Sequence, residues 1–321
     1  MVARPEPICA FDVTAEGRTR PVEDEGVVAA EGAAYRWLHF DVGVAGLEPW
    51  LRAHLPETAV DALLAPETRP RCDPHGTGAM VNLRGVNLNP GADPEDMVSL
   101  RLWVTPGLLV TARVRRIWAV DAVREDAATG RAPGSSGELV ARIAEGLVRR
   151  IEAVVSESEA EADALEDMML EGRALPLERL AEARHEAIKL RRFIRPQSEA
   201  LDALADGVAG EVTNPDALIL LREVEDRSAR GLEALDALRD RYAAMQDHLD
   251  AQRALEMGRN GYILSVVAAI FLPLGFLTGL FGVNVAGMPG VGEENAFWIL
   301  CAASAGLGVV LFLAFKLGRW L

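Results

Sequence analysis

The sequence predicts an α+β amino-terminal domain, a mixed sheet with helices, followed by a long stalk helix and two C-terminal transmembrane helices. Three observations lead to this fold class. Strand-like segments occur only up to about residue 130, apolar residues recur at helical spacing from Ser135 onward, and two long uncharged runs lie near the C-terminus. We expect three regions: an α/β domain over 1–134, a helical region over 135–260 and a transmembrane hairpin over 261–321.

Five segments of the first region read as strands, because they are short and mixed in composition and turn-rich pieces separate them. These segments are 8–13, 35–42, 79–88, 98–105 and 108–114. Turn-rich pieces such as 89–96 separate them, and the apolar spacing of 47–55 predicts a helix. The region therefore reads as a sheet with at least one covering helix.

Three long helices are predicted after Ser135. The first carries Leu139 and Ile143 at helical spacing, and the second starts near Pro176. The third starts at Asn214-Pro215-Asp216 and runs to Phe281 with Pro273 as its only later proline. Five of its apolar residues follow a 3-4-3-4 spacing, which predicts a seam that packs on copies of the chain or on neighbouring helices. They are Leu235, Leu238, Tyr242, Met245 and Leu249.

The two uncharged runs, 262–281 and 296–315, are each long enough to cross a hydrocarbon core of about 30 Å as a helix. The alternative is a buried helical hairpin of a soluble protein. The first residues lack the apolar core of a secretory signal, and basic residues flank the runs on their outer sides only, at Arg253, Arg259, Lys316 and Arg319. We therefore expect an inner-membrane, multi-pass protein with both termini in the cytoplasm. Three widely spaced cysteines agree with a reducing compartment.

One face of the first run is narrow and mostly small. It carries Leu264, Ala268, Leu272, Gly275 and Gly279 at steps of three and four residues. Such a face suits close packing between membrane helices, and it suits equally the wall of a pore. Because two helices cannot enclose a water-filled path, transport would require an oligomer.

The segment that ends this run, Gly282-Val283-Asn284, favours the pore. The last carbonyls of a helix lack partners and carry the negative end of its dipole, Asn284 adds an amide oxygen, and Gly282 allows close approach. Repeated around an axis, these oxygens would form a ring of neutral acceptors for a hydrated cation.

At this point the sequence resembles a known family. "FGVN" after a proline-containing apolar helix, followed by a short loop, a second span and a basic end, is similar to the Gly-x-Asn signature of the CorA metal ion transporter superfamily. The strings 271–290 and 69–103 and the ending "GRWL" resemble its zinc-transporting ZntB branch. The resemblance implies a CorA-like funnel, a homopentamer whose first spans line one pore, and a selectivity-filter role for Gly282, Val283 and Asn284. Val283 and Phe281 stand where magnesium-transporting members have Met and Tyr, which fits the zinc branch.

Two sets of residues bear on the metal. Glu293 and Glu294 lie in a loop without bases and would concentrate cations near the entrance. Cys72 and His75 form a Cys-x2-His pair, which would need two further ligands such as His39 or Cys9 to bind metal; a loop cysteine and a surface histidine are the alternative. The acidic run 157–171 reads as a solvated helix face, or as the acidic helical tip of the family's funnel. An oxygen ring does not itself select zinc over magnesium or cobalt.

The predicted function is transport of divalent cations, zinc uptake first, assisted by or coupled to protons as the resemblance implies. The transported ions are Zn²⁺ or, in the alternative of a CorA-type channel, Mg²⁺, Co²⁺ or Ni²⁺, with Cd²⁺ a further candidate; no tightly bound cofactor is expected. A membrane-anchored signalling or scaffold protein is the alternative of another class. An enzyme is not expected, since the sequence shows no phosphate loop or nucleophile motif. Membrane lipid and further copies of the chain are the expected partners, and nucleic acid is not.

Overall fold

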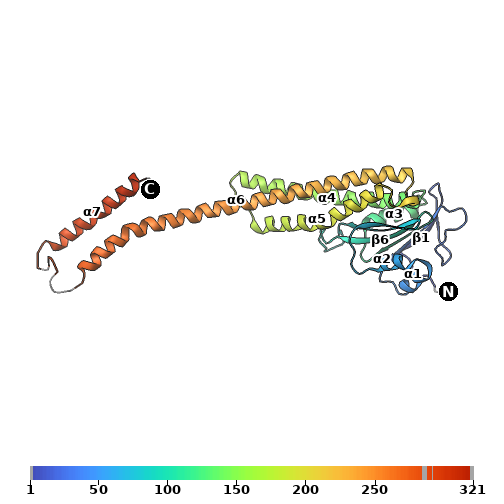
Figure 1. The fold of residues 1–321 in the computed structure, drawn as a ribbon, viewed down its shortest axis with the longest axis horizontal. Helices are drawn as coiled ribbons and strands as arrows, with labels where there is room; N and C mark the ends of the chain where they lie inside the picture. Colours follow the sequence, from blue (N-terminus) through green and yellow to red (C-terminus); the bar gives the residue numbers. More distant parts are fainter. Residues whose placement is uncertain (1–2, 284–287, 291, 319–321) are drawn as a thin grey trace. The chain divides into compact units, whose positions relative to one another are not determined.

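The computed structural model describes residues 3–283, 288–290 and 292–318. The chain forms two compact units, Met1–Met245 and Gln246–Leu321. The long helix α6 (Pro215–Phe281) begins in the first unit and ends in the second (Figure 1). The helix begins at Pro215, where the sequence predicts its start. The Asn214 side chain caps it by accepting a hydrogen bond from the Ala217 backbone N–H at 2.8 Å.

The first unit contains a seven-stranded mixed sheet in the order β2-β1-β3-β7-β6-β5-β4. The strands are β1 (Cys9–Val13), β2 (Thr19–Pro21), β3 (Tyr35–Asp41), β4 (Arg71–His75), β5 (Gly78–Gly85), β6 (Val98–Thr105) and β7 (Leu108–Arg113). Only β3 and β7 run parallel; every other pair is antiparallel. The five predicted strands correspond to β1, β3, β5, β6 and β7. The other two, β2 and β4, are short edge strands that contain proline, which edge positions tolerate.

Helices cover both faces of this sheet. The helices described in the whole chain are α1 (Leu47–His54), α2 (Glu57–Leu64), α3 (Trp118–Ala128), α4 (Ser136–Leu170), α5 (Leu177–Ala205), α6 and α7 (Ala296–Leu317), with a 3-10 turn at Gly210–Val212; α7 belongs to the second unit. One core joins the sheet to α1 and α2, and a second joins its other face to α3 and α4. Alternate residues of β3 enter the two cores, Leu38 the first and Trp37 the second. Burial on both faces explains why β3 carries large apolar side chains toward each core, although the strand also buries Arg36 and His39. The sequence analysis did not predict α2 or α3.

The three long helices of the first unit pack side by side (Figure 1). Leu235, Leu238, Tyr242 and Met245 of the predicted seam are buried within the single chain, and Leu249 is partly buried. The Tyr242 hydroxyl donates to the Ser158 carbonyl of α4 at 3.1 Å. The seam therefore packs on a neighbouring helix of its own chain, which was one of its two predicted uses.

Ion pairs reinforce this helical packing. Arg241 of α6 donates to Glu166 of α4 at 2.8 Å and to Asp163 at 2.5 Å, and Arg179 of α5 pairs with Glu161. Three acids of the predicted acidic run are thus engaged by basic residues of other helices. That face is only in part a solvated one, because these carboxylates tie α4 to α5 and α6.

Candidate functional site

The second unit consists of two helices that are apolar over most of their length. The last part of α6 and the whole of α7 each contain an 18-residue window of mean hydropathy 2.3, of which 6% and 0% respectively is buried within the chain. Both helices are long and apolar enough to cross a membrane. Side chains such as Leu272 and Phe276, 78% and 69% exposed, are incompatible with water as the only surrounding. Lipid or further protein must cover these faces.

The predicted pore face of α6 is not covered by the chain itself. Leu264, Ala268, Leu272, Gly275 and Gly279 are all exposed. At about 100° per residue they fall within about 80° of the helix circumference. An open apolar groove runs along this face and includes Ala268, Leu272 and Gly275.

The opposite side of α6 is the more buried one. Val266 is 8% exposed, and Ile270, Leu274 and Leu277 are partly buried. A Cβ atom on Gly308 of α7 would lie 4.0 Å from Leu274 Cδ1, so the Leu274 side chain reaches α7 on this side. Within the hairpin, α7 therefore lies against the side of α6 that faces away from the predicted pore residues.

Gly282 ends α6 and leaves little room for a side chain. The Gly282 N–H donates to the Thr278 carbonyl at 3.0 Å, and a Cβ on Gly282 would lie only 3.0 Å from that oxygen. A larger residue would crowd the last turn of the helix. Val283 follows and is 51% exposed. Asn284, the third member of the predicted filter, lies outside the described residues.

Glu293 and Glu294 are exposed in the turn that precedes α7. The Glu293 N–H donates to the Gly290 carbonyl, and the Glu293 carbonyl accepts from the Ala296 N–H, each at 3.2 Å. Both acids thus lie at the N-terminus of α7, where the helix dipole favours negative charge. They are placed together, and no basic residue of the described loop opposes them.

Cys72 and His75 do not converge on one ion. Both lie on strand β4 rather than in a loop, three positions apart, and therefore point to opposite faces of the sheet. Cys72 packs against the core on the α4 side, whereas the His75 ring lies 5.7 Å from that of Trp103 in the other core. Burial raises the pKa of Cys72 to about 11, and Asp73 adds to the effect, so the thiolate that would bind metal is disfavoured.

The two further ligands considered for that pair lie elsewhere. Cys9 and His39 are cross-strand partners of β1 and β3, and four strand spacings, roughly 19 Å, separate β3 from β4. His39 is fully buried and its Nδ1 lies 2.8 Å from Thr111 Oγ1. Among the residues that the structure describes, no group of three or more His, Cys, Asp or Glu side chains is arranged to hold a metal ion.

A buried arginine that the sequence analysis missed organises the start of the sheet. Arg36 of β3 is 0% exposed, and its Nε donates to Asp12 of β1 at 2.8 Å. Its Nη1 donates to Asp24 at 2.6 Å, and this bond lowers the pKa of Asp24 to about 2. The pairing attaches the segment between β2 and β3 to the sheet. No sequence signal marks it, because the three residues come together only when β1 and β3 pair.

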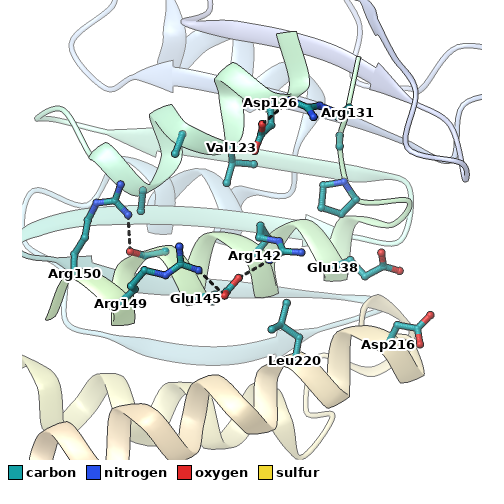
Figure 2. A pocket seen from close by; sticks show the side chains of 15 residues that line it. Val123, Asp126, Arg131, Glu138, Arg142, Glu145, Arg149, Arg150, Asp216 and Leu220 are labelled. Carbon is teal, nitrogen blue, oxygen red and sulfur yellow. Dashed lines mark hydrogen bonds and ion pairs between the residues drawn. The ribbon is translucent and has the colours of Figure 1, made fainter. Parts of the chain in front are cut away.

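A polar pocket lies in the first unit between α3, α4 and the start of α6 (Figure 2). Figure 2 shows Arg142 and Arg149 turned toward Glu145, to which each donates at 2.7 Å. Burial acts to raise the pKa of Glu145, but these two bonds outweigh it and lower the pKa. Arg131 pairs with Asp126 at 3.5 Å. These three pairings neutralise most of the arginine charge that lines the pocket.

Comparison with known proteins shows the family. Residues 32–317 match the family model described as CorA-like Mg²⁺ transporter protein. The chain is 36% identical over 290 residues to "Divalent cation transporter CmaX" of Pseudomonas aeruginosa, covering 89% of this chain and 87% of that one. It is 32% identical over 316 residues to "Zinc transport protein ZntB" of Yersinia pseudotuberculosis, covering 98% and 96%.

Solved structures agree with this fold. A structure of full-length CmaX superposes with a TM-score of 0.82 at 33% identity and covers 99% of both chains. The CorA magnesium transporter of Methanocaldococcus jannaschii has a TM-score of 0.74 at 16% identity, covering 98% of this chain and 100% of that one, and shows likeness of fold alone. With its mixed sheet, long helix and apolar hairpin, the chain belongs to the CorA-like family of divalent cation transporters.

Proposed function

We propose that the chain forms a homopentameric pore in the inner membrane that carries divalent cations into the cytoplasm, with zinc as the first substrate and protons assisting uptake. The observation that carries this proposal is the arrangement of the hairpin. The small face of α6 is open, whereas α7 lies against the other side. A ring of such hairpins can place the open faces around an axis and α7 toward lipid.

The names of the relatives support the choice of substrate class. One relative at 36% identity is described as a divalent cation transporter, and one at 32% as a zinc transport protein. Zinc is therefore the first ion to test, and magnesium, cobalt, nickel and cadmium follow. Because two helices cannot enclose a water-filled path, the pore needs several copies of the chain. The number five rests on the resemblance to the CorA superfamily. The two termini are assigned to the cytoplasm by the basic residues that flank the hairpin, such as Arg259 and Lys316.

The direction and the filter follow from electrostatics. An inside-negative potential favours inward movement of a doubly charged ion by about 4.6 kcal/mol per 100 mV. Gly282, Val283 and Asn284 would face the ion at the outer mouth, where Asn284 supplies an amide oxygen that holds the outer water shell. Glu293 and Glu294, in the turn before α7, would raise the local concentration of cations.

The test is flux of single metals into liposomes that contain the purified protein, with and without a pH gradient. We expect zinc uptake that rises when the outside is acid. Asn284→Ala should assemble as the parent does and lose selective flux. Magnesium flux that ignores the pH gradient would replace the zinc proposal with a CorA-type channel. No flux of any divalent cation would favour a signalling or scaffold protein instead.

A matched pair of cysteine variants tests the pore face itself, in a background where Cys301 is replaced by Ala. Leu272 lies on the open face and Leu274 on the side against α7. A charged, membrane-impermeant thiol reagent added during transport should block flux through Leu272→Cys and leave Leu274→Cys unaffected. Equal block of both variants, or of neither, would contradict the assignment of this face to the pore.

A further inference from the structure

A second pocket of the first unit is lined by unpaired basic side chains. It opens where β5 and β6 meet the segments that follow α2 and β7, and its volume is about 230 Å³. Arg84 of β5, Arg101 of β6 and Arg115 line it together with Ser99. The single carboxylate among its described lining residues is Asp96, which accepts from Lys189 Nζ at 3.3 Å. The pocket is therefore locally positive on a chain whose net charge is −15.

Arg101 is the residue that makes this pocket unusual. It is only 3% exposed, and no salt bridge involves it within the described part of the chain. Its Nη2 donates to the Ala65 carbonyl at 2.9 Å, while Nε and Nη1 are buried without a hydrogen-bond partner. Burial lowers the pKa of Arg101. A buried guanidinium with two unused donors is costly, and native structures normally satisfy such groups.

Arg84 adds a second guanidinium beside it. Nη1 and Nη2 donate to the carbonyls of Met97 and Thr68 at 2.8 and 2.6 Å, and Nε is buried without a partner. The guanidinium carbon lies 4.1 Å from the centre of the Phe193 ring, which holds the group in place. Burial lowers the pKa of Arg84, the nearby charges of Arg101 and Arg192 add to this effect, and the charge of Glu67 opposes it only in part. Two fixed and mutually repelling cations thus face a space that a counter-charge would stabilise.

We propose that this pocket binds a compact oxyanion of the phosphate class, either inorganic phosphate or the phosphate group of a small monoester. Guanidinium donors form charge-assisted bonds with phosphate oxygens, and Nε and Nη1 of Arg101 are two such donors that have no partner within the chain. The volume is below the roughly 300 Å³ at which pockets for drug-sized ligands begin, so a small ion fits better than a nucleotide. The pocket of Figure 2 differs, because Glu145 pairs with Arg142 and Arg149, and Asp126 pairs with Arg131.

The proposal is tested by equilibrium dialysis of labelled inorganic phosphate against the purified full-length protein, free of metal and at constant ionic strength. We expect saturable binding of one phosphate per chain. Arg101→Met keeps an unbranched apolar stem but removes the guanidinium and its charge, and should weaken binding about tenfold or more, as expected for the loss of bonds to a charged group. Arg115→Gln changes an exposed lining residue, leaves the core intact, and should weaken binding to a smaller extent.

Arg131→Met is the matched control, because Arg131 lies in the other pocket. It should bind phosphate as the parent does. Competition by glycerol 3-phosphate would identify a monoester as an acceptable source, and its failure would leave free phosphate as the ligand. Absence of saturable binding, displacement by equimolar chloride, or equal affinity in Arg101→Met and Arg115→Gln would each overturn the proposal.

Discussion

His39 makes the fold of the first unit sensitive to acid, and replacing it should remove that sensitivity. The side chain is 0% exposed, and its Nε2 is buried without a partner. Burial lowers the pKa of His39 to about 3, and the charge of Arg113 adds to the effect. The charged or titratable groups around it are Arg113 of β7, Asp121 and Arg124 of α3, and Cys9 of β1. His39→Asn retains a polar atom near Thr111 Oγ1 and does not titrate.

The magnitude follows from proton linkage. A histidine in the unfolded chain has a pKa of about 6.5, so between pH 6.5 and 3 the unfolded state binds about one proton more than the folded state. The folded state is therefore fully stabilised above pH 6.5 and loses about 1.4 kcal/mol for each pH unit below it. At pH 5 the loss attributable to His39 is about 2 kcal/mol relative to pH 7.5.

Urea unfolding of the whole protein in detergent at pH 7.5 and pH 5 measures the effect. The loss of unfolding free energy between the two pH values should be about 2 kcal/mol smaller in His39→Asn than in the parent. His185→Asn, which changes an exposed histidine of α5, is the control and should behave as the parent. An equal loss in parent and His39→Asn would refute the reasoning, because it would mean that His39 accepts a proton within the fold. The result also bears on tests of proton-assisted transport, which expose the protein to acid.

Two other predictions concern the helices and the loop. Leu238→Asp places a charge in the packing of α6, at a site only 1% exposed, and should cost several kcal/mol of unfolding free energy in the same urea assay. Ile219→Asp is the control, because this site of the same helix is 67% exposed, and it should cost less than about 0.5 kcal/mol. Similar stability of the two variants would show that the seam is not a core. Glu293→Gln with Glu294→Gln should lower the zinc uptake rate at low metal and low salt but spare the maximal rate, because exposed carboxylates act over only about 8 Å at physiological salt. A collapse of the maximal rate would instead identify them as direct ligands.

Much of the architecture was predictable because its signals are local. The start of α6 depends on a capping asparagine followed by proline, and the two apolar runs can be identified by their length and composition. Five strands were recognisable as short mixed segments between turn-rich pieces, whereas β2 and β4 were not, because a short strand with proline does not have a strand-like composition. The Gly-x-Asn segment was recognisable as a motif, but its role as a filter stays a prediction, since Asn284 lies outside the described residues.

The sequence by itself determined where the long helices and most strands lie and which segments are apolar enough for a membrane, because spacing, caps and composition act over a few residues. Only the tertiary structure decided that α7 lies against Leu274 and leaves Leu272 open, and that Cys72 and His75 face opposite sides of the sheet. It also decided that Arg101 is buried without a counter-charge. Each of these outcomes depends on which distant segments pair, and pairing is set by the packing of the whole chain rather than by its neighbours in sequence.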